Sequence, residues 1–115
     1  MSVTIYHNPK CSKSCQTLEL LGKKGITPNI IEYIKHPPTV EKLKEILSQL
    51  GIAPRDLIRK KENTYKELEL GNPSLSDKDL IDFMVEHPIL IERPIVIANG
   101  KATIGRPPEQ VLDIL

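Results

Sequence analysis

Short apolar runs and helix-periodic segments alternate along the first third of the chain. Residues 3–6 form an apolar run that is typical of a strand, and residues 29–33 form a second one. Between them, leucines recur at helical spacing and predict a helix from about residue 12 to residue 24, which Gly25 closes. A strand, a helix and a strand in this order predict a parallel crossover.

The middle of the chain has helical patterning. Thr39 can cap a helix whose apolar side chains form one stripe, and Gly51 ends it. Ser76 begins a second helix with a capping-box pattern, and Pro88 stops that helix. Residues 52–75 between these helices indicate short helical pieces and turns.

The last quarter of the chain contains the clearest hairpin pattern. The apolar runs 95–98 and 101–104 are joined by Asn99-Gly100, a pair that favours the tight turn needed by antiparallel strands. Pro107 and Pro108 can then open a final helix.

This order of elements predicts an α/β protein with a thioredoxin-like mixed sheet. We expect a single domain over residues 1–115, with a helical insertion at about residues 39–90 between the second and third strands. Pro94 stands directly before the third strand, where such domains usually carry a cis-proline beside the active cysteine.

Composition narrows the possible functions. The 115 residues, of which 39% are hydrophobic, suit one modest core, and 16 basic against 15 acidic residues give a formal charge of +1. Three tyrosines and one phenylalanine offer little material for base stacking, so we expect no nucleic-acid partner.

The start of the chain has no charged leader before an apolar stretch, and no segment approaches the length of a membrane span. We therefore expect no membrane association and a cytoplasmic location.

Candidate chemistry begins at Cys11, where the first strand gives way to the first helix. The free N–H groups of a first helical turn stabilise a thiolate over a thiol. An ordinary cysteine with a pKa of about 8.5 is only roughly 3% ionised at pH 7, so this placement matters for reactivity.

Cys15 follows at C-x-x-x-C spacing, which suggests redox chemistry. A metal would need further ligands, and only His7 is close in sequence, so we expect no metal site.

Four separated motifs together resemble a known family. They are residues 7–14, 57–59, 87–96 and 104–107, and they closely resemble the thioredoxin-fold arsenate reductases of the ArsC family, in one register over nearly the whole chain. The resemblance implies that Cys11 attacks arsenate.

The same resemblance implies that Arg59, Arg93 and Arg106 hold the oxyanion. Guanidinium groups suit this task because they supply paired donors and stay protonated, and positive charge near a thiol also favours its thiolate. Arg93 precedes Pro94 and Arg106 precedes Pro107, so both should emerge near the cysteine, whereas the role of Arg59 rests on the resemblance alone.

Two more residues near Cys11 have open interpretations. His7 matches the family histidine, which implies that it tunes the thiolate or orients the loop. Alternatively, His7 only hydrogen-bonds to the local backbone. Ser14, in the first helical turn, either donates a hydrogen bond to the thiolate or serves the local backbone.

The chain departs from the family motif at Cys15, where an arginine usually stands. Reduction of arsenate to arsenite takes two electrons and hence two thiols. The resemblance implies no tightly bound cofactor, with glutathione as the expected co-substrate and glutaredoxin, or thioredoxin, as the protein reductant. Cys15 is either an internal resolving thiol or a half-buried residue that behaves as an apolar one. Residues four apart in a regular helix are too distant for a disulfide, so a bridge needs Cys11 to precede the helix or the first turn to open.

Two rival functions remain open. The first is a redox-sensing regulator of the Spx type, which binds RNA polymerase. This chain resembles such regulators in its opening strand and in its arginine-proline stretch. However, these regulators typically have a C-x-x-C motif and lack the run at residues 105–107. A glutathione-dependent thiol oxidoreductase would use the same thiolate on mixed disulfides.

Overall fold

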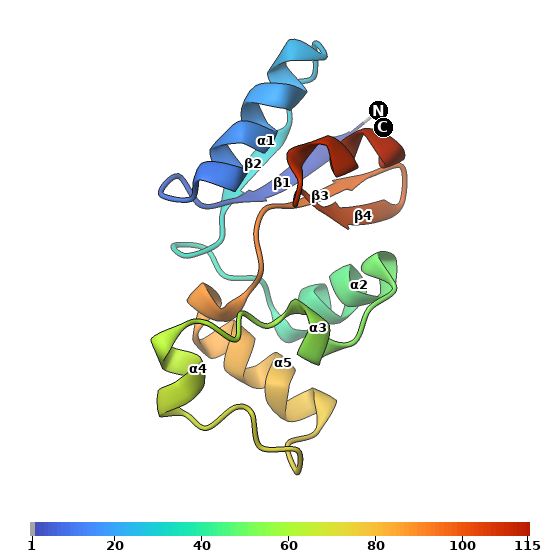
Figure 1. Cartoon of the computed structure of the whole chain (residues 1–115). Coiled ribbons are helices and arrows are strands. Elements are labelled where there is room, and N and C mark those ends of the chain that lie inside the picture. Colours follow the sequence, from blue (N-terminus) through green and yellow to red (C-terminus); the bar gives the residue numbers. More distant parts are fainter. Residues whose placement is uncertain (1) are drawn as a thin grey trace. The chain divides into compact units, whose positions relative to one another are not determined.

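The chain divides into two compact units (Figure 1). The computed structural model describes residues 2–115, and its first unit runs up to His36 and resumes over Arg93–Leu115. The second unit is Pro37–Glu92, which corresponds closely to the predicted helical insertion at 39–90. The expectation that both units form one domain stays a prediction.

The first unit is built on a four-stranded mixed sheet with the order β2-β1-β3-β4. The strands are β1 (Val3–His7), β2 (Asn29–Glu32), β3 (Ile95–Ala98) and β4 (Lys101–Ile104). β1 and β2 are parallel, whereas β3 pairs antiparallel with both β1 and β4. The predicted thioredoxin-like sheet and its crossover are therefore confirmed. Asn99 and Gly100 join β3 to β4 with φ angles of 55° and 72°, as a primed turn requires.

Two helical segments pack on one face of this sheet. They are α1 (Ser12–Lys23) and η2 (Pro108–Ile114). Side chains alternate across a strand, so every second residue of β1 and β3 faces these helices. The resulting core is Val3, Ile5, Leu21, Val96, Ala98 and Val111. Burial of each of its larger side chains contributes roughly 1.5–3 kcal/mol relative to exposure.

The ends of α1 and η2 follow their sequences closely. Gly25, just beyond α1, has a φ of 74°, which supports the predicted stop. The final helix is also present, but as a 3₁₀ helix: the amide of Gln110 bonds to the carbonyl of Pro107, three residues back.

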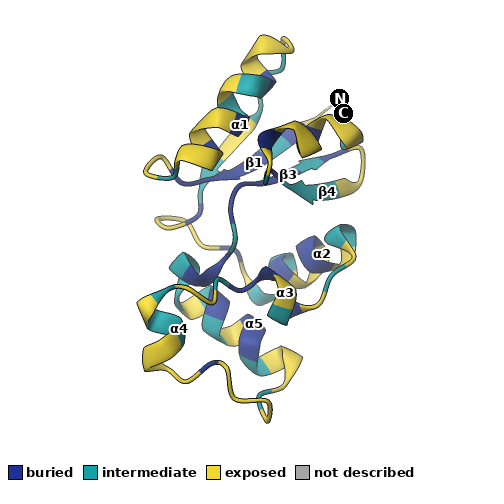
Figure 2. Cartoon of the chain, in the orientation of Figure 1, coloured by how far each residue is buried: buried dark blue, intermediate teal, exposed yellow. Residues whose placement is uncertain are grey.

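The second unit consists of short helices joined by loops, with an isolated antiparallel bridge between Ile58 and Ile91. Its elements are α2 (Val40–Leu50), α3 (Pro54–Leu57), α4 (Asn63–Glu67), α5 (Asp77–Glu86) and the 3₁₀ helix η1 (Pro88–Leu90). Both α2 and α3 pack on α5. Figure 2 shows the buried residues in stripes along α2 and α5.

The predicted ends of α2 and α5 are confirmed. Thr39 accepts a hydrogen bond from the amide of Lys42 at 3.1 Å, and Gly51 ends α2 in the left-handed conformation. Ser76 and Asp79 form the reciprocal capping box that begins α5.

Candidate active site

Sheet register brings three distant segments of the first unit together. Tyr6 pairs with Ile95, and Ile95 pairs with Ile104. The loop after β1, the residues before β3 and the residues after β4 therefore share one edge of the sheet. Cys11, Arg93 and Arg106 come from these three segments, as the positions beside the two prolines predict.

Cys11 is the N-cap residue of α1. Its φ of −101° and ψ of 122° are those of extended backbone, so it lies just outside the regular helix. Its amide bonds to the carbonyl of Asn8 at 3.0 Å, and the side chain of Asn8 accepts from the amide of Lys10 at the same distance. These bonds fold residues 8–11 into a tight turn. Cys11 stands at the end of this turn and is partly exposed.

The surroundings of Cys11 favour its thiolate. Partial burial raises the pKa of the thiol, but hydrogen bonds outweigh it: they come from the backbone N–H of Ser14, from the side chain of Arg93 and from the backbone N–H of Lys13. The positive charge of Arg93 acts in the same direction, and the net result is a pKa below the ordinary value of a cysteine. The helix N-terminus thus acts as predicted.

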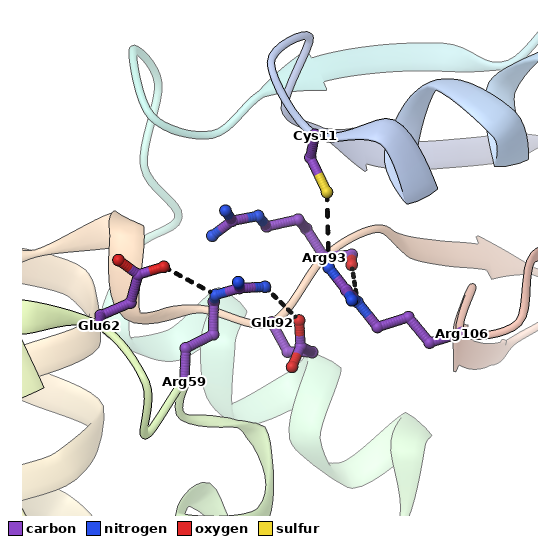
Figure 3. A network of polar contacts seen from close by, with 6 residues as sticks. All are labelled: Cys11, Arg59, Glu62, Glu92, Arg93 and Arg106. Carbon is purple, nitrogen blue, oxygen red and sulfur yellow. Dashed lines mark hydrogen bonds and ion pairs between the residues drawn. The ribbon is translucent and has the colours of Figure 1, made fainter.

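Two guanidinium groups of the first unit adjoin the sulfur (Figure 3). Nη2 of Arg106 lies 3.5 Å from Sγ of Cys11, and Nε of the same side chain donates to the carbonyl of Arg93 at 2.8 Å. Arg93 is itself buried, with only 9% of its surface exposed. A backbone contact therefore holds Arg106 beside Cys11, and the Arg93 side chain also hydrogen-bonds to the Cys11 sulfur.

Arg59 belongs to the second unit, and its partners there are carboxylates. Its Nε donates to Glu62 at 3.0 Å and its Nη1 to Glu92 at 2.7 Å (Figure 3). Its backbone amide bonds to the carbonyl of Leu90 at 2.7 Å, so the segment is anchored as well. A role for Arg59 in holding an oxyanion stays a prediction.

His7 and Ser14 form a buried pair beneath the Cys11 turn. Nδ1 of His7 lies 2.6 Å from Oγ of Ser14, and the same oxygen accepts from the amide of Asn8 at 3.1 Å. Burial lowers the pKa of His7, although the nearby Glu32 carboxylate opposes the shift. The contacts favour the loop-orienting role of His7. Ser14 reaches the sulfur through its backbone N–H, and its hydroxyl serves the loop instead.

The expectation of a half-buried Cys15 is wrong, because this residue is exposed on α1. Its thiol donates a hydrogen bond to the carbonyl of Pro9 at 3.3 Å. The helix turns position 15 outward, whereas the two neighbouring positions Ser14 and Thr17 are buried. Cys11 and Cys15 are both free thiols.

Sequence reasoning missed how tightly Gly105 packs. A Cβ at this position would lie 2.6 Å from Oγ1 of Thr17 and 2.9 Å from Cγ of Pro94, so only glycine fits. The Gly105 amide also bonds to the carbonyl of Pro94 at 2.9 Å. The Arg93–Pro94 and Arg106–Pro107 peptide bonds are both cis. No pattern in the sequence singles out Thr17, because the residue that it contacts, Gly105, is distant in sequence.

Two features are absent from residues 2–115, the part of the chain that the structure describes. Within that range no group of three or more His, Cys, Asp or Glu side chains could hold a metal ion. Among the same residues, no helix combines the length and the apolar character of a membrane span.

Comparisons with known proteins agree over nearly the whole chain. The sequence model of the ArsC family matches residues 6–114. The YfgD protein of Escherichia coli (strain K12) is 54% identical over 114 residues, which are 98% of this chain and 96% of that protein. An arsenate reductase of Rhizobium meliloti (strain 1021) is 48% identical over 115 residues, all of this chain and 82% of the relative. The structure of an arsenate reductase from Vibrio cholerae superposes with a TM-score of 0.98 at 59% identity, covering 100% of this chain and 98% of the other.

Proposed function

Because the chain belongs to the ArsC family, we propose that it is an arsenate reductase in which the Cys11 thiolate attacks the arsenic atom of arsenate. The single observation that carries this proposal is the setting of the Cys11 sulfur. Arg93 and Arg106 adjoin it, and the first turn of α1 directs amide N–H groups to it. A nucleophile and the cations that would attract its anionic target thus share one site.

The first step joins sulfur to arsenic. Arsenate carries negative charge on several oxygens, and the forked donors of Arg93 and Arg106 match that geometry. As the thiolate attacks, one arsenate oxygen takes up protons and leaves as water. The two guanidinium groups would neutralise charge on the remaining oxygens, and Arg59 would contribute a third cation if arsenate reaches it.

A second thiol completes the reduction. It attacks the sulfur of the Cys11 adduct and forms a sulfur–sulfur bond, while the sulfur–arsenic bond breaks with its electron pair remaining on arsenic, and arsenite leaves. Two thiols together lose two electrons and arsenic gains two. We propose that glutathione with a glutaredoxin, or a thioredoxin, is the reductant that restores Cys11. This chemistry fits the cytosol, where thiol reductants are maintained.

The test is an arsenite assay with glutathione and glutaredoxin. We expect the wild-type chain to form arsenite in many turnovers, and the Cys11→Ser variant to form no more than a protein-free control, because a serine hydroxyl at neutral pH is a far weaker nucleophile. Thermal unfolding of both proteins checks that the variant is folded. Equal arsenite yields from the two folded proteins would contradict the proposal.

A further inference from the structure

Cys15 is a reactive side chain that the proposed function leaves without a task. It is exposed and reduced, and it follows Cys11 by four residues on the same helix. Resting on the proposed function, we propose that Cys15 is the resolving thiol of the reaction, which releases arsenite by closing a Cys11–Cys15 disulfide within the chain. Glutathione is then needed to reopen this disulfide and not to release arsenite.

The backbone at Cys11 makes such a bridge feasible. In a regular helix, residues four apart have Cβ atoms about 5–6 Å apart, whereas a disulfide needs roughly 3.5–4.5 Å. Cys11 escapes this restriction because its φ and ψ are extended and it precedes the first helical residue, Ser12. The amide of Cys15 bonds to the carbonyl of Cys11 at 3.0 Å, which places the two residues on successive levels of one helix side. Closing the bridge requires this first turn to adjust until the two Cβ atoms reach disulfide distance.

The direction of the Cys15 side chain supports the same conclusion. Its thiol bonds to the carbonyl of Pro9, which belongs to the turn that carries Cys11. The side chain therefore points back toward the N-terminal end of α1, as helical side chains generally do. A thiol is a weak donor, so this contact is given up at little cost when the sulfur moves.

The step balances without any other oxidant. In the adduct, the sulfur of Cys11 is bonded to arsenic. The Cys15 thiolate attacks that sulfur, the sulfur–sulfur bond forms, and the sulfur–arsenic bond breaks with its electron pair remaining on arsenic. The proton of Cys15 passes to solvent or to an arsenite oxygen. Arsenate and two thiols thus become arsenite, one disulfide and water.

The test is a single turnover without any added thiol. Fully reduced protein is mixed with excess arsenate under nitrogen and quenched in acid, and arsenite, free thiols and intact mass are then measured. For the wild-type chain we expect one arsenite per chain, loss of both thiols and a mass lower by two hydrogen atoms, with a peptide that links Cys11 to Cys15. An identical sample without arsenate shows whether the disulfide depends on the substrate.

Two variants make the test specific. Cys15→Ser should release no arsenite in this single turnover, and the Cys11 adduct should persist until glutathione is added. Gln16→Ala, a change at the exposed neighbouring position of α1, should behave as the wild type does. A structural role of Cys15 would not produce this pattern, because it predicts no arsenate-dependent disulfide.

Failure of this inference is distinguishable from failure of the proposed function. If the wild-type chain turns over with glutathione and glutaredoxin but keeps both thiols in the single turnover, the resolving role of Cys15 is overturned and the arsenate reductase stands. If no arsenite forms under either condition, both are overturned.

Discussion

The two units hold their arginines in contrasting ways. In the first unit, Arg106 bonds to a backbone carbonyl and to the Cys11 thiol, neither of which is a carboxylate. In the second unit, Arg59 bonds to the carboxylates of Glu62 and Glu92. A guanidinium group that already pairs with carboxylates offers less attraction to an incoming anion, because part of its charge is neutralised. The contacts, and not the residue type, therefore reveal which arginine acts on the thiol.

The largest effect is expected from loss of Arg106. Arg106→Ala removes a donor that lies 3.5 Å from the sulfur, and removal of one such preorganised donor typically lowers the catalytic rate by about 10²–10³-fold. Arg106→Lys should recover only part of this loss, since an ammonium group lacks the fork that also reaches the Arg93 carbonyl. Steady-state arsenite formation measures both variants. A folded Arg106→Ala protein with wild-type kcat/KM would contradict the difference drawn between Arg106, which acts on the thiol, and Arg59, which pairs with carboxylates.

Gly105→Ala tests the support of Arg106. The added methyl group overlaps Thr17 and Pro94, and such overpacking typically costs 1–3 kcal/mol, or about 4–8 °C in Tm per kcal/mol for a chain of this size. Activity should fall as well, because Arg106 is the next residue.

Gly22→Ala is the matched control for that substitution. Gly22 lies in α1 with open space around a Cβ, so alanine should stabilise the helix by roughly 0.5–1 kcal/mol. Thermal melts and arsenite assays compare the two variants. Equal Tm values for them would show that the packing at Gly105 is not restrictive.

Arg59→Ala probes the second unit and should have a smaller effect. We expect KM for arsenate to rise about tenfold, the cost of about 1.4 kcal/mol of binding. The pKa of Cys11 should stay unchanged, because the groups that lower it belong to the first unit. Arg55→Ala is the control in the same unit: Arg55 bonds only to backbone carbonyls among its described contacts, those of Leu70 and Asn72, and its loss should leave KM unaffected. A KM in Arg59→Ala that is no higher than in the wild type would show that Arg59 does not bind arsenate.

The smallest effect concerns His7 and pH. Burial lowers the pKa of His7 in the folded chain below its ordinary value of 6.5, so the unfolded chain binds the proton more readily. The contribution of neutral His7 to stability is therefore fully present above about pH 6.5 and is lost as the pH falls through the folded pKa. His7→Gln should flatten the decline of Tm below pH 6.5. An unchanged decline would show that His7 is not responsible.

Local signals in the sequence predicted most elements and the placement of Cys11. Asn99-Gly100 specifies its hairpin, and Thr39 and Gly51 specify both ends of α2, because each acts on neighbouring backbone. The contacts that distinguish the arginines are of another kind. Glu92 is 33 residues from Arg59 in sequence, and Cys11 is 95 residues from Arg106. Such pairs depend on the folded chain and leave no local pattern.

The exposure of Cys15 and the form of η2 show the same limit. The sequence alone does not show whether a helical cysteine is buried or exposed. Here Ser14 and Thr17 are on the buried side of α1, so Cys15 is exposed. The consecutive prolines predicted where the last helix starts, but the 3₁₀ form emerges only in the hydrogen bonds that follow them.

The pKa of the Cys11 thiol tests the central claim most directly. The rate of alkylation by iodoacetamide, measured against pH in the Cys15→Ser background, reports this one thiol, because the thiolate is the reactive form. We predict a midpoint below the ordinary value of about 8.5, and a midpoint shifted upward when Arg93→Met removes the nearby charge without leaving a large cavity. A midpoint at or above the ordinary value in the parent protein, unmoved by Arg93→Met, would contradict the account.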